Sequence, residues 1–231
     1  MPSLRVLSYN VRSMRDDPAA LARVIRSAEP DVVCVQEAPR FLRWRSKCAR
    51  LARTSGLVVV GGGRPAAANL ILSTLGVDAV RTADVLFSKD RRLHQRGSAI
   101  AVLRIGGAPF AVAGTHLDLV AEPRLRHVSE LHAALAAHVP AEVPAIICGD
   151  MNCPPGSPPW AALTELLRDA FAVAGVGSAF TSTARNPHQT IDGIFVDPRI
   201  TVQSARVLDQ SDVEVASDHR PLLAELELRA Q

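Results

Sequence analysis

Residues 145–152 read Ala-Ile-Ile-Cys-Gly-Asp-Met-Asn, an apolar run that ends in an acid, Asp150, and an amide, Asn152. The run has the length and composition of a buried strand. Three other apolar runs end in the same way and lead into Asn10, into Gln36-Glu37 and into His116-Leu-Asp118. Loops at strand ends are where a rigid sheet presents binding and catalytic groups. A polar residue after a strand is also ordinary turn chemistry, so any single ending leaves both interpretations open.

Short apolar runs continue along the chain, with few helical stretches between them. Ten expected strands against four expected helices indicate an α/β fold of two packed sheets with helices outside. The helices are too sparse for a regular doubly wound fold. The expected strands are Leu4–Tyr9, Asp31–Val35, Leu57–Gly61, Leu70–Leu72, Ser98–Ile105, Phe110–Thr115, Ala145–Cys148, Thr190–Val196, Thr201–Leu208 and Pro221–Leu228.

Four helices are expected from capping residues and apolar periodicity. The pair Asp17-Pro18 predicts the start of the first, since an N-cap acid and a proline in the first turn are typical there. A stripe that includes Phe41 and Trp44 predicts a second helix with these side chains in the core, closed by Gly56. The third is expected to begin at Pro123, with Leu125, Val128, Leu131 and Leu135 facing inward, and the fourth to run from Trp160 to Leu167.

The composition excludes several classes of protein. The chain has 231 residues, of which 48% are hydrophobic and 21% charged, which rules out disorder, a collagen-like repeat and a disulfide scaffold. A chain of this length buries about 70% of its unfolded surface, so the core needs no disulfide or metal. The four cysteines lack zinc-ligand spacing, and Cys34 and Cys148 lie in apolar runs, where free thiols are expected. Cys153 follows a polar cluster, so a nucleophilic role for it stays open.

The net charge and the N-terminal sequence bear on the partners and the cellular location of the protein. The net charge of +3 permits a nucleic-acid partner without demanding one. No segment approaches the roughly 18 consecutive apolar residues of a membrane span. The N-terminus alternates like a strand and lacks the basic head and apolar stretch of a signal peptide. We therefore expect a cytoplasmic protein, and a monomer.

Two later clusters, Ile-Asp192 and Ser-Asp218-His219, complete an ordered set of polar motifs. Together the motifs resemble those of the endonuclease/exonuclease/phosphatase superfamily, which includes deoxyribonuclease I, abasic-site endonucleases, neutral sphingomyelinases and inositol-polyphosphate 5-phosphatases. The resemblance implies one catalytic domain over residues 1–231, with two packed mixed β-sheets flanked by helices. The motifs are Ser-Tyr-Asn10-Val, Val-Gln36-Glu37, Ala-Asn69-Leu-Ile-Leu-Ser73, Arg96-Gly97-Ser, Thr-His116-Leu, Gly-Asp150-Met-Asn152, Ile-Asp192 and Ser-Asp218-His219.

The resemblance implies hydrolysis of a phosphoester with a divalent cation, usually Mg²⁺, with Mn²⁺ as an alternative. An all-oxygen ligand set suits Mg²⁺, which keeps several waters and needs only one or two carboxylates. Glu37 matches the family's principal metal carboxylate. Asn10 matches the residue that holds the geometry of the metal site, and Asp218 is expected to join it directly or through water.

The catalytic roles implied by the resemblance fall on five residues. His219 matches a histidine that binds the scissile phosphate or accepts a proton, and Asp192 matches the acid that orients its imidazole. Asp150 matches the residue that positions or deprotonates the attacking water. Asn152 is expected to donate hydrogen bonds to phosphate oxygens, and His116 to be a second phosphate ligand or a general acid.

Two departures from the family pattern leave the substrate open. Arg12 stands where the family often has an acid or an amide, and Gly193 stands where it commonly has an aromatic residue. A phosphodiester is favoured over a small phosphomonoester. A catalytically silent phosphate-binding module is the alternative of a different class.

Substrate contacts are predicted for Asn69, Arg91, Arg92 and Arg96. The basic residues between Arg40 and Arg53 are interpreted mainly as the solvated face of a helix. Aromatic residues make up only 4% of the chain, which gives little support for a platform on which nucleic-acid bases stack. An arrangement of Arg40, Arg91, Arg92 and Arg96 along one groove leading to Glu37 would favour a nucleic acid.

Overall fold

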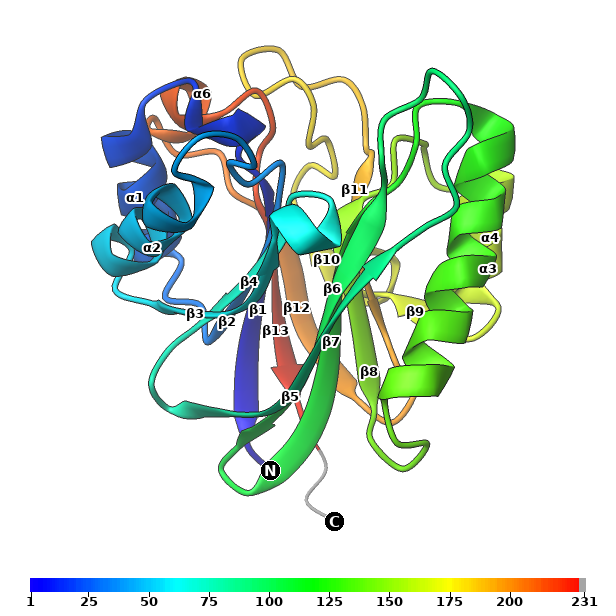
Figure 1. Cartoon of the computed structure of the whole chain (residues 1–231). Coiled ribbons are helices and arrows are strands. Elements are labelled where there is room, and N and C mark those ends of the chain that lie inside the picture. Colours follow the sequence, from blue (N-terminus) through cyan, green and yellow to red (C-terminus); the bar gives the residue numbers. More distant parts are fainter. Residues whose placement is uncertain (229–231) are drawn as a thin grey trace.

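Two mixed β-sheets pack face to face in the computed structural model, which describes residues 1–228, and helices cover both outer faces (Figure 1). The first sheet has seven strands. Their order across the sheet is β10 (Gly175–Val176), β12 (Thr201–Val207), β13 (Leu222–Glu227), β1 (Ser3–Asn10), β2 (Val32–Gln36), β4 (Asn69–Ser73) and β3 (Val58–Gly63).

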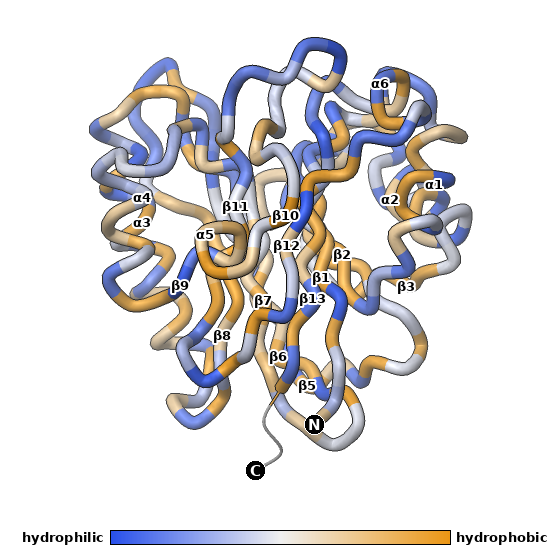
Figure 2. The backbone as a smooth tube through the Cα atoms, turned by 180° about the vertical axis from the view of Figure 1, so that it is seen from behind, coloured by the Kyte–Doolittle hydropathy of each residue, from blue (hydrophilic) through white to orange (hydrophobic). Residues whose placement is uncertain are grey.

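The second sheet has six strands, and apart from the short helix at Ala170–Ala174 the helices lie in two groups on opposite flanks in both views of the chain (Figures 1 and 2). The strand order is β5 (Val77–Leu86), β6 (Gly97–Ile105), β7 (Ala108–His116), β8 (Ala145–Asp150), β11 (Asp192–Val196) and β9 (Arg168–Asp169). Helices α1 (Pro18–Ser27), α2 (Trp44–Thr54) and α6 (Val213–Ala216) cover the first sheet, and α3 (Ala121–His138) and α4 (Pro158–Thr164) cover the second. The short elements are η1 (Arg12–Met14), η2 (Arg64–Ala66) and α5 (Ala170–Ala174).

The expected fold of two packed mixed sheets flanked by helices is confirmed. All ten expected strands are present, with ends that differ by no more than two residues. Strand β5 was not expected. Most of its side chains are exposed at the sheet edge, so it lacks the apolar alternation that marks a strand, and pairing with β6 defines it. Cys34 and Cys148 are free and buried, as expected, and Cys48 and Cys153 are free and buried as well.

Strand β1 shows why the apolar runs are nearly continuous. Leu4 and Val6 face the second sheet, while Leu7 and Tyr9 face the helices α1 and α2. A strand with both faces buried needs apolar side chains in both of its alternating rows. The runs therefore mark the central strands of the sandwich.

The first helix begins where the sequence predicts. The side chain of Asp17 accepts hydrogen bonds from the backbone N–H groups of Ala19 and Ala20, at 2.8 and 3.1 Å, and Pro18 is the first helical residue. These bonds satisfy donors that have no partner within the helix, which stabilises it by about 1 kcal/mol.

Two expected core side chains are exposed. Helix α2 begins only at Trp44, so Phe41 lies in the preceding loop with 70% of its surface exposed. The prediction for Phe41 was wrong because Arg43, with φ of 57°, turns the chain before the helix starts. The prediction for Leu125 was also wrong, since at 100° per residue it falls outside the buried arc of α3. That arc is formed by Pro123, His127, Val128, Leu131 and Ala134.

The close approach of β7 and β8 depends on Gly149, which pairs with Thr115. A Cβ atom at this position would overlap the carbonyl oxygen of Thr115. We therefore expect Gly149→Ala to lower the free energy of unfolding by about 1–3 kcal/mol, as overpacking does. Urea denaturation measures the effect. Gly76→Ala is the control, because its nearest neighbour would be the Thr74 hydroxyl at 3.8 Å, and equal midpoints for both variants would contradict the prediction.

Candidate active site

The polar residues at the strand ends belong to the side-chain row that lies between the two sheets. Along β8, Ile146 and Cys148 face the other sheet, and the same alternation directs Asp150 into this space. Asn10 continues such a row on β1 and His116 on β7, each two residues beyond an inward-facing position. Asp192 begins the row on β11, which runs antiparallel to β8 and pairs with it at Asp150. The space between the sheets is apolar along most of the strands and polar at the end where Asn10, His116, Asp150 and Asp192 lie.

Asp150 lies at the centre of this polar end. Its Oδ2 accepts a hydrogen bond from Asn10 Nδ2 at 3.0 Å. The same oxygen is 3.4 Å from His116 Nε2 and 3.8 Å from His219 Nε2. Only 1% of Asp150 is exposed, and a carboxylate this deeply buried needs several polar partners. Side chains from β1, from β7 and from the loop before β13 therefore converge on one oxygen.

Asp192 and His219 form a second close pair. Asp192 Oδ2 lies 2.9 Å from His219 Nδ1, which leaves Nε2 directed toward Asp150. The backbone N–H of Asp192 also donates to the Thr181 hydroxyl at 3.3 Å. The other carboxylate oxygen of Asp192 is buried without a hydrogen-bond partner. The pair fixes the orientation of the imidazole and stabilises its charged form.

The two histidines have opposite electrostatic environments. Burial lowers the pKa of His116 to about 3 despite the charge of Asp150, so its imidazole is neutral. Burial also disfavours the charged form of His219, but the charge and hydrogen bond of Asp192 outweigh this effect and raise its pKa to about 10. At neutral pH the site therefore holds one imidazole and one imidazolium.

This difference gives a titration test. In the metal-free protein, histidine NMR is expected to show His116 neutral down to about pH 3 and His219 protonated up to about pH 10. Because the pKa of folded His219 lies above its unfolded value, its contribution to stability is complete below pH 6.5 and is lost as the pH rises to 10. His116 behaves oppositely, and its contribution is lost as the pH falls from 6.5 to 3. Ordinary titration of both rings near pH 6.5 would contradict the assignment.

Glu37 directly follows β2 and has a left-handed backbone conformation, with φ of 52°. A non-glycine residue there costs about 1 kcal/mol, and such strain concentrates at functional sites. The turn brings Glu37 Oε1 within 3.4 Å of Asn10 Nδ2, while Asn10 Oδ1 accepts a hydrogen bond from the backbone of Arg12 at 3.1 Å. The side-chain amide of Asn10 thus donates hydrogen bonds to two carboxylates, those of Glu37 and Asp150.

This donor set fits a divalent cation. Two carboxylates that converge on one neutral amide repel each other, and a cation between them would relieve the repulsion. Their hard oxygen atoms are the ligands that Mg²⁺ and Mn²⁺ prefer. A second group, Asp150, Asp192 and His219, has ligand atoms within 4.8 Å of one another and could also hold a metal ion.

A cleft of about 420 Å³ opens above these residues. Asn152 lines it, and its Nδ2 donates to the carbonyl of Leu117 at 3.0 Å. Arg40 and Arg96 also line the cleft. Arg96 Nε is buried without a hydrogen-bond partner and lies 3.8 Å from Asp118 Oδ2. The cleft is also lined by Glu37, His116, Asp150 and His219.

Four predicted site residues lie apart from this centre. Asp218 forms an ion pair with Arg12 at 3.2 Å and lines a neighbouring pocket. Asn69 is fully buried, and its Nδ2 donates to the carbonyls of Ala66 and Gly97 at 2.9 and 3.0 Å. Arg91 and Arg92 are exposed on the loop before β6, and neither is among the residues that line the cleft.

Sequence reasoning missed two residues of the site. Asp118 is 3% exposed and faces Arg96, and the sequence marks it at the same strand end as His116 but gives it no role in the site. Thr181 is fully buried and accepts the hydrogen bond from Asp192. It lies in an irregular segment without apolar periodicity, so nothing in the sequence singles it out.

The order of the motifs is matched by a family model. The model described as "Endonuclease/Exonuclease/phosphatase family" matches residues 7–219, which include every residue of the site. The chain belongs to the endonuclease/exonuclease/phosphatase family. Enzymes of this family hydrolyse phosphoesters and generally depend on a divalent metal ion.

Solved structures support the family fold over nearly the whole chain. An endonuclease/exonuclease/phosphatase family protein from Bacteroides thetaiotaomicron has a TM-score of 0.86 at 19% identity, over 99% of both chains. The mannosyl-6-phosphatase Bt3783 of the same organism has a TM-score of 0.85 at 18% identity, over 97% of this chain and 100% of that one. D. rerio TDP2 with a single-stranded DNA product scores 0.75 at 16% identity, over 98% and 100%. Among curated proteins, no sequence matches significantly.

The family's known activities include more than one class of phosphoester, and the likeness at these identities concerns the fold. No helix of residues 1–228 combines the length and the apolar character needed to cross a membrane. The choice of substrate in this endonuclease/exonuclease/phosphatase chain therefore depends on the cleft and its rim.

Proposed function

We propose that this protein is a Mg²⁺-dependent phosphodiesterase of the nuclease type and that residues 1–231 act as one catalytic domain. The observation that carries the proposal is the convergence on Asp150 Oδ2 of Asn10, His116 and His219, at 3.0, 3.4 and 3.8 Å. His219 is oriented by Asp192 at 2.9 Å. A buried acid beside an imidazolium can activate water next to a group that binds phosphate.

The proposed role of each residue follows from the charge of its side chain. His219, as an imidazolium, binds a phosphate oxygen through Nε2 and stabilises the negative charge that develops there. Asp150 positions the attacking water and accepts its proton. His116 is neutral at the pH of the cell, so it donates a hydrogen bond and does not act as a general acid. Arg96 Nε, a buried donor without a partner, and Asn152 supply further contacts to phosphate oxygens.

Glu37, held by Asn10, would bind the metal ion together with Asp218 if Arg12 releases that carboxylate. A bound Mg²⁺ or Mn²⁺ supplies Lewis-acid stabilisation of the charge on the leaving oxygen. The contact of Glu37 with the Asn10 amide, beside the buried carboxylate of Asp150, supports a cation at Glu37.

Loss of the metal carboxylate is expected to weaken both metal binding and hydrolysis. Glu37→Gln should raise the Kd for Mg²⁺ about tenfold or more, because the site loses a negatively charged ligand. Isothermal titration with Mg²⁺ measures the affinity. Glu165→Gln, on the exposed end of α4, is the control. Equal Mg²⁺ affinity in Glu37→Gln and the unaltered protein would place the metal elsewhere.

The function itself is tested with a panel of phosphodiesters and phosphomonoesters in Mg²⁺ or Mn²⁺, with and without EDTA. Hydrolysis of a simple diester that EDTA abolishes is expected. Full activity in both Glu37→Ala and His219→Ala would overturn the proposal. Turnover restricted to monoesters would favour the phosphomonoesterase alternative. Absence of turnover, with phosphate binding that survives both substitutions, would favour a catalytically silent module.

Only two of the four arginines considered for substrate binding lie at the cleft. Arg40 and Arg96 line the cleft that contains Glu37, whereas Arg91 and Arg92 do not. A nucleic-acid substrate is therefore compatible with the rim without being required by it. A cytoplasmic location and a monomeric state stay predictions.

A further inference from the structure

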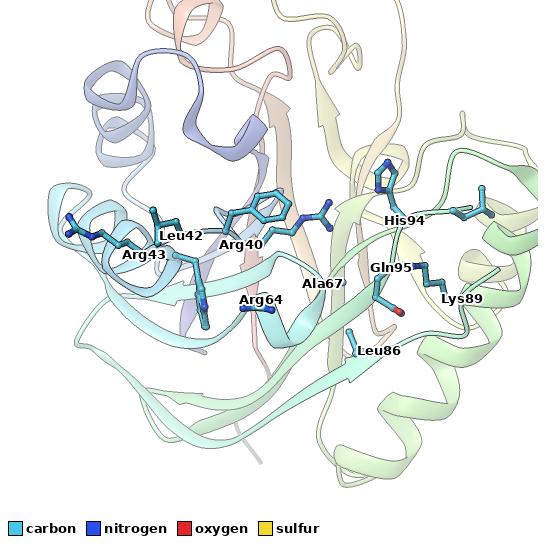
Figure 3. Close-up of a pocket in the computed structure, with 12 residues that line it drawn as sticks. Arg40, Leu42, Arg43, Arg64, Ala67, Leu86, Lys89, His94 and Gln95 are labelled. Atoms are coloured by element: carbon cyan, nitrogen blue, oxygen red, sulfur yellow. The ribbon is translucent and has the colours of Figure 1, made fainter. Parts of the chain in front are cut away.

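A second pocket, of about 700 Å³, adjoins the catalytic cleft (Figure 3). Arg40, Phe41, Ala67 and His94 line both cavities, so a ligand can extend from one into the other. One wall comes from the loop before α2 and from η2, and the other from the end of β5 and the loop that follows it. We call this cavity the side pocket and define it by Arg40, Phe41, Trp44, Arg64, Lys89 and His94.

The ionisable side chains of the side pocket are of one sign. Arginine and lysine residues from both walls reach its rim, and no aspartate or glutamate is among the described residues that line it (Figure 3). The chain as a whole carries 26 basic and 23 acidic residues, so this is a local segregation of charge. Such a cavity attracts an anionic group. Its cations are Arg40, Arg64 and Lys89, whereas the guanidinium of Arg43 points away from the cavity (Figure 3).

The side pocket also presents aromatic surface. Phe41 is 70% exposed, and the Arg40 guanidinium lies 5.3 Å from the centre of its ring. Trp44 forms part of the same wall, with Arg45 stacked 4.4 Å from its ring centre. Although aromatic residues are scarce in this chain, two of them line one cavity. The exposed Phe41 ring beside the Arg40 guanidinium forms a surface on which a planar group can stack, whereas Trp44 is only partly exposed.

We propose that the side pocket binds the non-reacting part of the substrate, and that this part is a nucleotide unit: a planar base that stacks on the Phe41 wall and a second phosphate that pairs with Arg64. The proposal rests on the phosphodiesterase function proposed above. A sugar phosphate alone has no planar group that could stack on the Phe41 ring and the Arg40 guanidinium. An acyl chain would leave the cations without one.

To fill both cavities, a ligand needs a phosphodiester group in the catalytic cleft and, attached to it, a base and a further phosphate in the side pocket. A free dinucleotide and a single strand of nucleic acid both present it. In either case the scissile phosphate would lie beside His219 and Asp150, and the adjoining nucleotide would extend past Arg40 into the side pocket.

Three substrates with the same p-nitrophenyl leaving group test the proposal: methyl p-nitrophenyl phosphate, thymidine 5′-(p-nitrophenyl phosphate) and its 3′-phosphorylated form. Replacing methyl by thymidine should raise kcat/KM about tenfold through stacking. The added 3′-phosphate should raise it about tenfold again through a charge-assisted contact. Equal kcat/KM for all three substrates would overturn the side-pocket proposal and leave the phosphodiesterase function standing.

Variants assign each gain to a residue. Phe41→Leu should abolish the gain from thymidine, whereas Phe41→Trp should keep it. The gain depends on an aromatic ring for stacking, which an apolar side chain of similar size does not provide. Arg64→Ala should abolish the gain from the 3′-phosphate. Arg53→Ala, on the exposed end of α2, is the matched loss of an arginine and should change neither ratio. Unchanged ratios in Phe41→Leu and Arg64→Ala would overturn the proposal.

Binding without turnover separates this proposal from the failure of catalysis. In EDTA, thymidine 3′,5′-bisphosphate should quench Trp44 fluorescence in a saturable way, and Arg64→Ala should weaken the affinity about tenfold. Absence of such binding would overturn the side-pocket proposal, whether or not a diester is hydrolysed. Co-sedimentation with phosphatidylserine vesicles that Phe41→Leu abolishes, without any nucleotide preference, would overturn it in favour of a lipid surface. A gain that continues with longer oligonucleotides identifies a strand, and one that stops after one nucleotide identifies a small molecule.

Discussion

Asp150→Asn is expected to lower kcat/KM for a phosphodiester about a thousandfold or more, within the range that the loss of a general base produces. The substitution keeps the shape of the side chain but removes the charge that accepts a proton from water. It also removes the carboxylate on which Asn10, His116 and His219 converge. Steady-state kinetics in saturating Mg²⁺ measures the loss.

Asp118→Asn is the matched control for this prediction. Asp118 is another buried acid beside the cleft, but its contacts are Arg96 at 3.8 Å and the backbone of Val120 at 3.0 Å. We expect a loss of less than about tenfold for this variant, since it removes one charge near the rim and no group that accepts the proton. Comparable losses in the two variants would show that any buried acid here has the same effect, and would remove Asp150 from the chemical step.

Asp192→Asn is expected to lower kcat/KM about 10²- to 10⁴-fold and to change the pH dependence of the activity that is left. The carboxylate raises the pKa of His219 to about 10 and fixes its ring at 2.9 Å. Without that charge, the pKa of His219 should fall toward or below its ordinary value of 6.5, because burial disfavours the imidazolium. The variant should therefore be more active near pH 6 than near pH 8.

The pH profile separates this role from simple misfolding. The unaltered protein should show no loss of activity from deprotonation of His219 between pH 6 and 8, since its imidazolium persists to about pH 10. Ring signals of His219 in the NMR spectrum of Asp192→Asn report its new pKa directly. A variant that loses activity equally at all pH values, with the His219 pKa unchanged, would contradict the assignment.

Much of the fold can be predicted from local pattern, because the central strands are buried on both faces and appear as apolar runs. Strand β5 escapes such prediction. Its side chains are mostly exposed, so only pairing with β6 makes it a strand. The start of α2 also escapes, because the left-handed conformation of Arg43 places Phe41 in the loop. Phe41 then becomes part of the side pocket wall, which the count of aromatic residues gave no reason to expect.

The polar residues that end the strands can be identified in the sequence, and the two-residue period shows which residues share their row. The sequence does not show which row lies between the sheets, because both faces of the central strands are apolar. It could not determine which residues meet. Asn10 and Asp150 are 140 positions apart, and their hydrogen bond exists because the two sheets pack face to face. The same packing leaves Arg91 and Arg92 outside the cleft and brings Arg96 into it. Tertiary structure decided the partners because contacts between layers depend on how whole sheets stack, which no local spacing encodes.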